Sequence, residues 1–323
     1  MFKKVISVLL LLALITGIFS VSATAAESQA RLYTVYGNGM LFEQNKDAIF
    51  AGEGEPGSII RVQLLNNNGW PIKTASSKVN EDGTFEVSFI APAGSYNEYS
   101  VVLTQNNDVF ATLNNVVFGE LWLASGQSNM QFPLGQSVKG SEMMNSGKKL
   151  SKWLRVCIEP VYPTYNGTNA VPSQPQNDIA GVTWINGENS SIYSMSAVAY
   201  FFAEELMNKL DMPVGILNSS LGGSSIRSWL SREAIEADEV LKKELIDADN
   251  YIADSEWDEN NIDIYTDMTA NYNLRTHAYR NFRPSGLIWY QGESDLQQTN
   301  TRVYAENFSA LMTYMRGTHN LIN

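Results

Sequence analysis

Residues 121–130 read LWLASGQSNM, in which a short apolar run ends in a loop of small and polar residues. The pattern recurs twice: SSLGGS at 219–224 follows the apolar residues 213–217, and QGESD at 291–295 follows residues 286–290. A short apolar run bounded by turn-forming residues is typical of a buried strand in a parallel sheet. Ligands bind at the carboxyl ends of such strands, so we expect these three loops to lie together.

Helical segments alternate with these strands. In residues 195–210 apolar side chains recur at the spacing of one helix face, and residues 302–316 also have a helical pattern. The charged segment 231–249 is a third predicted helix, with Ser231 as its N-cap. Strands that alternate with helices predict an α/β fold whose parallel sheet is covered on both faces.

The preceding residues 31–117 have a different pattern. Apolar and polar residues alternate over 60–64 and again over 85–89, which is typical of strands with one buried face. Turn sequences such as EPG at 55–57 separate these strands. We therefore predict a small β-sandwich module at residues 27–117, followed by the α/β domain at residues 118–323. The β-pattern alone indicates only a structural or accessory module.

Composition excludes several classes of protein. Of the 323 residues, 44% are hydrophobic and 11% aromatic, which rules out a disordered chain. The net charge is 22 − 34 = −12, so nothing suggests a nucleic-acid partner or an anionic membrane surface. The single cysteine, Cys157, excludes an intramolecular disulfide. With only two histidines we expect neither a metal site nor a cofactor.

The first 26 residues have the features of a signal peptide. Lys3 and Lys4 precede an apolar run at 5–19, and the sequence ATA at 23–25 offers a cleavage site. A transmembrane anchor is the alternative, but the run is short for spanning a bilayer. We predict export to the periplasm or the cell exterior, and a mature charge of −12 − 2 = −14.

The three loops contain residue types that suit nucleophilic catalysis. A nucleophilic serine works best at a sharp turn between a strand and a helix, and Ser128 has that place in the sequence. Gly222 and Gly223 would allow backbone N–H groups to approach the same point, and Glu293 could orient a histidine. Each residue also has a simpler explanation: a helix cap for Ser128, a turn for the glycines and a solvated carboxylate for Glu293.

The loop sequences resemble those of sialate O-acetylesterases, which are carbohydrate acetylesterases of the SGNH/GDSL hydrolase group. The resemblance extends over most of residues 30–316 and includes the β-rich part. It implies an SGNH-type three-layer α/β/α hydrolase domain. The residues that carry it are GELWLASGQSNM at 119–130, SAVAYFF at 196–202, PVGI at 213–216, GGS through Trp229 at 222–229, WYQGES at 289–294, GML at 39–41 and GEPG at 54–57.

The resemblance implies hydrolysis of acetyl esters on sialic acid or another glycan in two steps. Ser128 would be the nucleophile, and the backbone N–H groups of Ser128 and of Gly222 or Gly223 would bind the oxyanion. Relatives with a Gln-Gly-Glu sequence use the glutamate as the acid partner of the catalytic histidine, a role that would fall to Glu293. Gln291 and Gln127 would contribute polar contacts in the pocket. The Asn donor found in the wider group is replaced, because the sequence here is GESD at 292–295.

The sequence departs from the family pattern at its histidines. The family places its catalytic histidine in a late Asp-x-x-His block, but position 274, three before His277, is leucine, and position 316, three before His319, is arginine. The general base is therefore not identified. A truncated product, a fragment and a pseudoenzyme all fit the sequence. We expect little activity, since a lost triad member leaves only residual catalysis, and low stability, since missing carboxy-terminal strands would expose one edge of the sheet.

Two other classes remain open. An inactive homologue could act as a glycan-binding protein, for which the missing base is the supporting feature. A lipase-type α/β-hydrolase needs Gly-x-Ser-x-Gly, whereas Met130 occupies the last position here. The particular acetylated sugar and the oligomeric state are not determined by the sequence.

Overall fold

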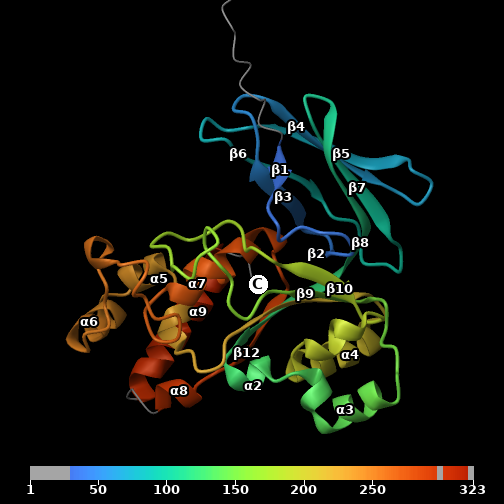
Figure 1. Ribbon diagram of the computed structural model, residues 1–323. Coiled ribbons are helices and arrows are strands. Elements are labelled where there is room, and N and C mark those ends of the chain that lie inside the picture. The colour runs from blue at the N-terminus through green and yellow to red at the C-terminus, as the bar shows by residue number, and fades with distance from the viewer. Residues whose placement is uncertain (1–29, 297–300, 319–323) are drawn as a thin grey trace, which may run out of the picture.

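The computed structural model describes residues 30–296 and 301–318 of a mixed α/β protein with a large mixed sheet (Figure 1). The predicted signal peptide at 1–26 and His319 lie outside the described residues. Within the described part of the chain, no helix combines the length and hydropathy needed to cross a membrane.

Four parallel strands form the part of the sheet that positions the three loops. Their order is β9 (Leu154–Ile158), β11 (Val214–Ser220), the second half of β8 (Asp108–Gly126) and β12 (Gly286–Tyr290), with β10 (Thr183–Asn186) antiparallel to β9 at one edge. Gly126 is paired with both Ser220 and Tyr290. The three strands therefore end in one row, and the loops that follow them start side by side.

Helices cover both faces of these strands. On one face, α4 (Ala197–Leu210), α2 (Ser128–Gln131) and α3 (Val138–Asn145) pack against strand residues that include Ala124, Val156 and Ile216. On the other face, strand residues such as Leu123 and Leu217 share a hydrophobic cluster with α5 (Arg232–Ala237), α6 (Glu239–Asp247) and α9 (Thr301–Thr318). The strands β8, β11 and β12 each contain a short apolar run, because helices cover both faces at these positions; β12 is only partly buried.

The helix predicted over 231–249 is divided into α5 and α6. Ser231 is the N-cap of α5, as predicted, and accepts a hydrogen bond from the Ala234 N–H. Asp238 ends α5 and caps α6, because its Oδ1 accepts from the N–H groups of Val240 and Leu241 at 3.1 Å. An aspartate that competes for backbone N–H groups favours a helix start over a helix interior.

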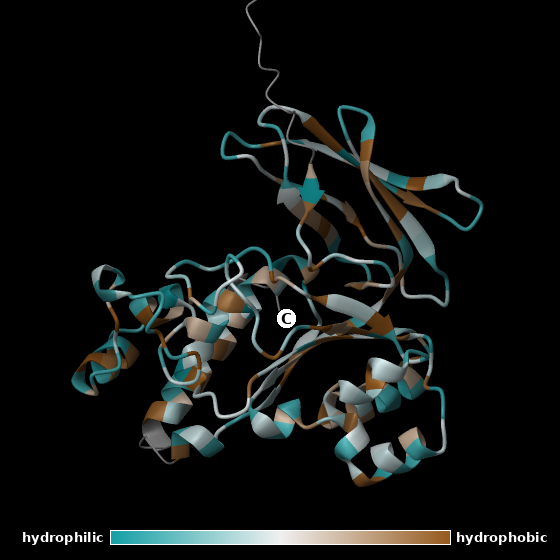
Figure 2. Cartoon of the chain, viewed as in Figure 1, coloured by the Kyte–Doolittle hydropathy of each residue, from teal (hydrophilic) through white to brown (hydrophobic). Residues whose placement is uncertain are grey.

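The amino-terminal part consists of two antiparallel sheets. One contains β1 (Arg31–Leu32), β3 (Asp47–Glu53) and β6 (Thr84–Ile90). The other contains β5 (Pro71–Lys78), β4 (Ile59–Leu65), β7 (Tyr99–Gln105) and the first half of β8. Figure 2 shows hydrophobic and hydrophilic residues alternating along these strands, which is the period of two read from the sequence.

The expected domain boundary between residues 117 and 118 falls inside β8. The first half of this 19-residue strand pairs with β7, and the second half pairs with β11 and β12. The short strand β2 (Leu41–Glu43) pairs with β8 at residues 117–119, where the two halves meet. One continuous strand therefore joins the β-rich part to the parallel strands.

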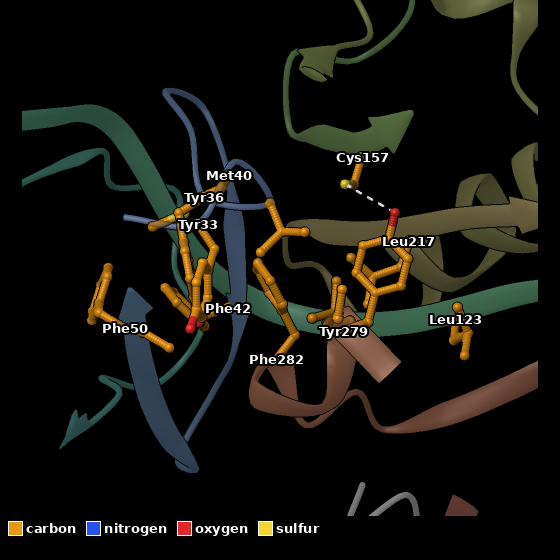
Figure 3. Packing of buried hydrophobic residues seen from close by; sticks show 14 of the residues in the cluster. Tyr33, Tyr36, Met40, Phe42, Phe50, Leu123, Cys157, Leu217, Tyr279 and Phe282 are labelled. Carbon is orange, nitrogen blue, oxygen red and sulfur yellow. Dashed lines mark hydrogen bonds between the residues drawn. The ribbon is translucent and has the colours of Figure 1, made fainter. Parts of the chain in front are cut away.

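An aromatic cluster holds the two parts together (Figure 3). Phe282, in the 3₁₀ helix η5 (Thr276–Phe282), stacks on Phe42 and Tyr36 with ring centroids 5.2 and 5.3 Å apart. Phe50 packs edge-on against Phe42. These rings belong to the same buried cluster as Leu123 of β8, so the β-rich part packs on the α/β part through a continuous core.

Glu43 is a buried carboxyl group at the junction of the two parts. It is only 4% exposed, and its Oε2 accepts the N–H of Leu121 at 2.7 Å. Burial raises the pKa of Glu43 to about 7, and the negative charge of Glu120 acts in the same direction. Because the pKa is higher in the folded state, the stability contributed by Glu43 is present below pH 4.5 and is lost as the pH rises through about 7.

We predict that Glu43→Gln removes this pH dependence while keeping an acceptor for the Leu121 N–H. Between pH 4.5 and 8, the free energy of unfolding of the variant should rise relative to the parent protein by about 3 kcal/mol. Urea unfolding at both pH values measures this difference. The exposed Glu188→Gln variant is the control, and an equal pH response of both variants would contradict the assignment.

Candidate active site

Ser128 lies at the turn from β8 into α2. The strand ends at Gly126, whose φ of +142° and position suit only glycine, since a β-carbon there would lie 2.1 Å from the carbonyl oxygen of Tyr290. Gln127 precedes the helix and is buried, whereas Ser128 is exposed. The predicted strand–turn–helix position of Ser128 is therefore present, at the end of the sheet where α2 meets β12 (Figure 1).

The loop after β11 lies directly against Ser128. A β-carbon on Gly222 would be 3.4 Å from the Ser128 Cβ and 3.5 Å from its Cα. The N–H of Gly222 donates to Oε1 of Gln131, at the end of α2, over 2.8 Å. One of the two N–H groups expected to bind an oxyanion is therefore paired with a side chain in this structure.

The loop after β12 is bonded to α2 and to the turn before it. The N–H groups of Gly292 and Ser294 both donate to Oε1 of Gln127 at 3.2 Å, and the side-chain amide of Asn129 donates to Oε1 of Glu293. The buried side chain of Gln127 therefore holds this loop in place through two hydrogen bonds. Glu293, the first residue of α8 (Glu293–Leu296), lies beside the residue that follows Ser128.

Gln291 links the second and third loops. Its side-chain amide donates to the carbonyl of Ser224 at 3.0 Å and to Oδ2 of Asp295. All five polar or glycine positions predicted around Ser128, namely Gln127, Gly222, Gly223, Gln291 and Glu293, thus lie on the two loops and the turn that contact one another at this end of the sheet.

Asp295 is a structural residue of the site that the sequence did not reveal. It is 5% exposed, and its carboxylate accepts the N–H of Ile226 at 3.0 Å, at the start of the 3₁₀ helix η3 (Ile226–Trp229). Burial raises its pKa, against the hydrogen bonds from Gln291 and Ile226. The pairing spans 69 residues, and nothing in the local sequence indicates it.

Several buried polar atoms at this site have no hydrogen-bond partner among the described residues: Ser125 Oγ, Ser220 Oγ, Gln291 Oε1 and Glu293 Oε2. Buried polar groups are normally paired, so such atoms mark places where a ligand or water binds. Glu293 holds one oxygen toward Asn129 and leaves the other available to accept a proton donor.

His277 is engaged elsewhere. It lies in η5, where its Nδ1 is hydrogen-bonded to the Tyr272 hydroxyl at 2.8 Å, and that hydroxyl also pairs with Tyr314 of α9. Burial, together with the nearby charge of Arg280, lowers the pKa of His277 to about 4. The imidazole is therefore neutral at pH 7 and is bonded to tyrosine.

Over residues 30–296 and 301–318, no group of three or more His, Cys, Asp or Glu side chains could hold a metal ion. Cys157 is buried against the hydroxyl of Tyr279, 3.9 Å away, as Figure 3 shows.

Comparison with known proteins adds three findings. A family model described as carbohydrate esterase, sialic acid-specific acetylesterase, matches residues 194–322, a range that includes Gly222 and Glu293 and begins after Ser128. The chain is 26% identical to the sialate O-acetylesterase of Homo sapiens and 25% identical to that of Pongo abelii, over 86% of its own length and 51% of theirs. It thus spans about half the length of the curated relatives it matches.

A solved structure shows the same fold over most of the chain. A carbohydrate acetylesterase from Xanthomonas citri is similar with a TM-score of 0.71 and 25% identity. The similarity covers 90% of this chain and 58% of that one.

We predict that Asp295→Ala destabilises the second and third loops. The substitution leaves the buried Ile226 N–H without its acceptor and the Gln291 amide with the Ser224 carbonyl alone, which should cost about 1–3 kcal/mol of unfolding free energy. Amide hydrogen exchange at Ile226 should accelerate. Asp295→Asn, which keeps one acceptor oxygen, is the matched control and should show a smaller loss; equal effects of the two variants would disprove this role.

Proposed function

The chain belongs to the sialate O-acetylesterase family, and from this we propose that it is a carbohydrate O-acetylesterase with Ser128 as the nucleophile. The observation that carries the proposal is the contact of three loops around an exposed serine. Ser128 begins a helix at a strand end, the Gly222 backbone lies against it, and Glu293 is bonded to the adjacent Asn129.

In the proposed reaction the Ser128 Oγ attacks the carbonyl carbon of an acetyl ester on a sugar. The bond from that carbon to the sugar oxygen then breaks, the sugar hydroxyl leaves with a proton, and an acetyl-serine remains. Water attacks the acetyl-serine and releases acetate. The proton of the serine must pass to a general base, and we do not assign this role to His277 because its Nδ1 is bonded to Tyr272.

Backbone groups near Ser128 would stabilise the oxyanion. Ser128 is the first residue of α2, and an N–H at that position has no acceptor within its own helix. The Gly222 N–H is the second proposed donor. Since Oε1 of Gln131 occupies this donor, we propose that the amide oxygen stands where the oxyanion would bind and is displaced by the ester.

Glu293 would orient the imidazole of the general base, a role for which we assign no histidine of the described residues. Its Oε2 is buried and has no partner among the residues described, so it could accept a ring N–H and hold the other nitrogen toward the serine. In this proposal Gln291 and Gln127 are positioning residues, because their side chains bond to the loops around Ser128.

The proposal also covers the architecture and location of the protein. We assign residues 118–323 to an SGNH-type hydrolase domain with three α/β/α layers, and residues 27–117 to a β-sandwich module. Helices on both faces of the parallel strands and the two antiparallel sheets support this division. Residues 1–26 would be a signal peptide, so the protein would act outside the cytoplasm on an acetylated carbohydrate.

We predict that Ser128→Ala lowers kcat/KM for 4-nitrophenyl acetate and for an O-acetylated sialic acid by roughly 10³-fold or more, because the nucleophile is removed. Release of acetate by the purified protein measures both reactions. Ser191→Ala, which changes an exposed serine of another helix, should retain the parent activity. Equal turnover by the Ser128 variant and the parent would contradict the proposal. Sugar binding without any serine-dependent release would favour the glycan-binding alternative.

A further inference from the structure

Two tyrosines lie beside the Gly222–Gly223 turn. A β-carbon on Gly223 would be 3.5 Å from Cδ1 of Tyr265, so this ring lies against the turn that touches Ser128. The hydroxyl of Tyr265 is hydrogen-bonded to the hydroxyl of Tyr162 at 3.0 Å. Tyr162 is 57% exposed, which makes it one of the most exposed aromatic side chains near this end of the sheet.

Buried groups hold both tyrosines in place. The carbonyl of Tyr265 accepts the N–H of Ser225 at 2.7 Å, which ties it to the loop after β11. The guanidinium of Arg275 is 1% exposed and donates to the carbonyl of Val161, next to Tyr162, while it pairs with the buried Glu159. The two rings are therefore positioned before any ligand binds, which lowers the entropy cost of binding.

The tyrosines form part of the wall of a hollow of about 380 Å³. Its other walls include Pro163, Asn169, Ile264 and Asp263. Small-molecule sites commonly have this volume, a mostly apolar and aromatic lining and a few polar groups that fix orientation. Nothing in the proposed acetyl-transfer chemistry uses these residues.

We propose that Tyr162 and Tyr265 form a subsite for the uncharged pyranose ring that carries, or adjoins, the acetyl ester. This rests on the proposed function for the identity of the ligand. The C–H faces of a pyranose pack on aromatic rings, and Asn169 can bond to its hydroxyl groups. The contact of Tyr265 with Gly223 places the ring next to the loop at which Ser128 would meet the ester.

The charge of the lining favours a neutral ring. Asp263 is the one charged side chain among the described residues that line the hollow. Its two oxygens accept hydrogen bonds from the Tyr265 N–H at 2.8 Å and from the Thr266 hydroxyl at 3.0 Å, so the carboxylate is fixed in this wall. A sugar carboxylate would be repelled there, and the subsite therefore selects neutral acetylated glycans over sialic acids.

Saturation-transfer difference NMR and titration with methyl β-D-xylopyranoside test the subsite without requiring catalysis. The parent protein and Ser128→Ala should bind this neutral sugar equally. Tyr162→Ala and Tyr265→Ala should weaken binding by about two- to tenfold, because each removes one aromatic face. Tyr265→Phe keeps the ring and should retain most of the affinity. Trp70→Ala, which removes an exposed aromatic residue preceding β5, is the matched control and should change nothing.

N-acetylneuraminic acid is the second probe and should bind more weakly than the xyloside. The difference in affinity between the two sugars should be smaller in Asp263→Asn, which removes the negative charge. Xyloside binding that is unchanged in both tyrosine variants, or stronger binding of the anionic sugar, would overturn the proposal. If Tyr265→Ala does not fold, the exposed Tyr162→Ala decides the outcome. Tyrosine-dependent binding without serine-dependent acetate release would disprove the proposed function and leave the subsite standing. Serine-dependent acetate release without tyrosine-dependent sugar binding would support the proposed function and disprove the subsite.

Discussion

The parallel register of β8 with β11 and β12 is the constraint on which the candidate site depends. Gly126 is paired with Ser220 on one side and with Tyr290 on the other, so three chain segments leave the sheet at the same level. The backbone of Tyr290 approaches so closely that a β-carbon at position 126 would meet its carbonyl oxygen. A shift of either neighbour by one residue would turn every side chain to the opposite face and separate the loops from Ser128.

A buried polar network around Glu159 connects the ends of the strands to the segments that surround the candidate site. Glu159 follows β9 and is bonded to Arg275, to the Ser219 hydroxyl at 2.9 Å and to the Tyr279 hydroxyl at 3.3 Å. Removing two charges from water is costly, so a pair of this kind is tolerated because additional hydrogen bonds satisfy it. Arg275 also bonds to the carbonyl of Val161, and the Ser225 N–H bonds to the carbonyl of Tyr265. These bonds fix the segments that carry Tyr162 and Tyr265 relative to the strand ends.

The amino-terminal part depends on the same strand. Because β8 passes without interruption from the antiparallel sheet into the parallel strands, and because Phe282 stacks on Phe42, the two parts share one core. Glu43 is buried at this junction and bonded to Leu121, close to the start of the segment that leads to Ser128. The β-rich part is therefore in a position to stabilise the strand that presents the proposed nucleophile.

Local sequence patterns determined the three strands that end in the loops, of which β11 and the second half of β8 are buried and β12 is partly buried. They also determined the alternating strands of the amino-terminal part and the position of Ser128 between a strand and a helix. These features depend on periodicity and on turn-forming residues, which act over a few neighbouring positions. The tertiary structure alone decided three hydrogen bonds of the site. The side chain of Gln131 accepts the Gly222 N–H, and Asp295 accepts the Ile226 N–H. The side chain of Asn129 donates to Glu293, which is 164 residues away in the sequence. It also decided that β8 continues through the expected boundary and that Asp238 divides a helix. The physical reason is that a hydrogen bond between distant residues is set by the register and packing of whole elements, and no short stretch of sequence contains both partners.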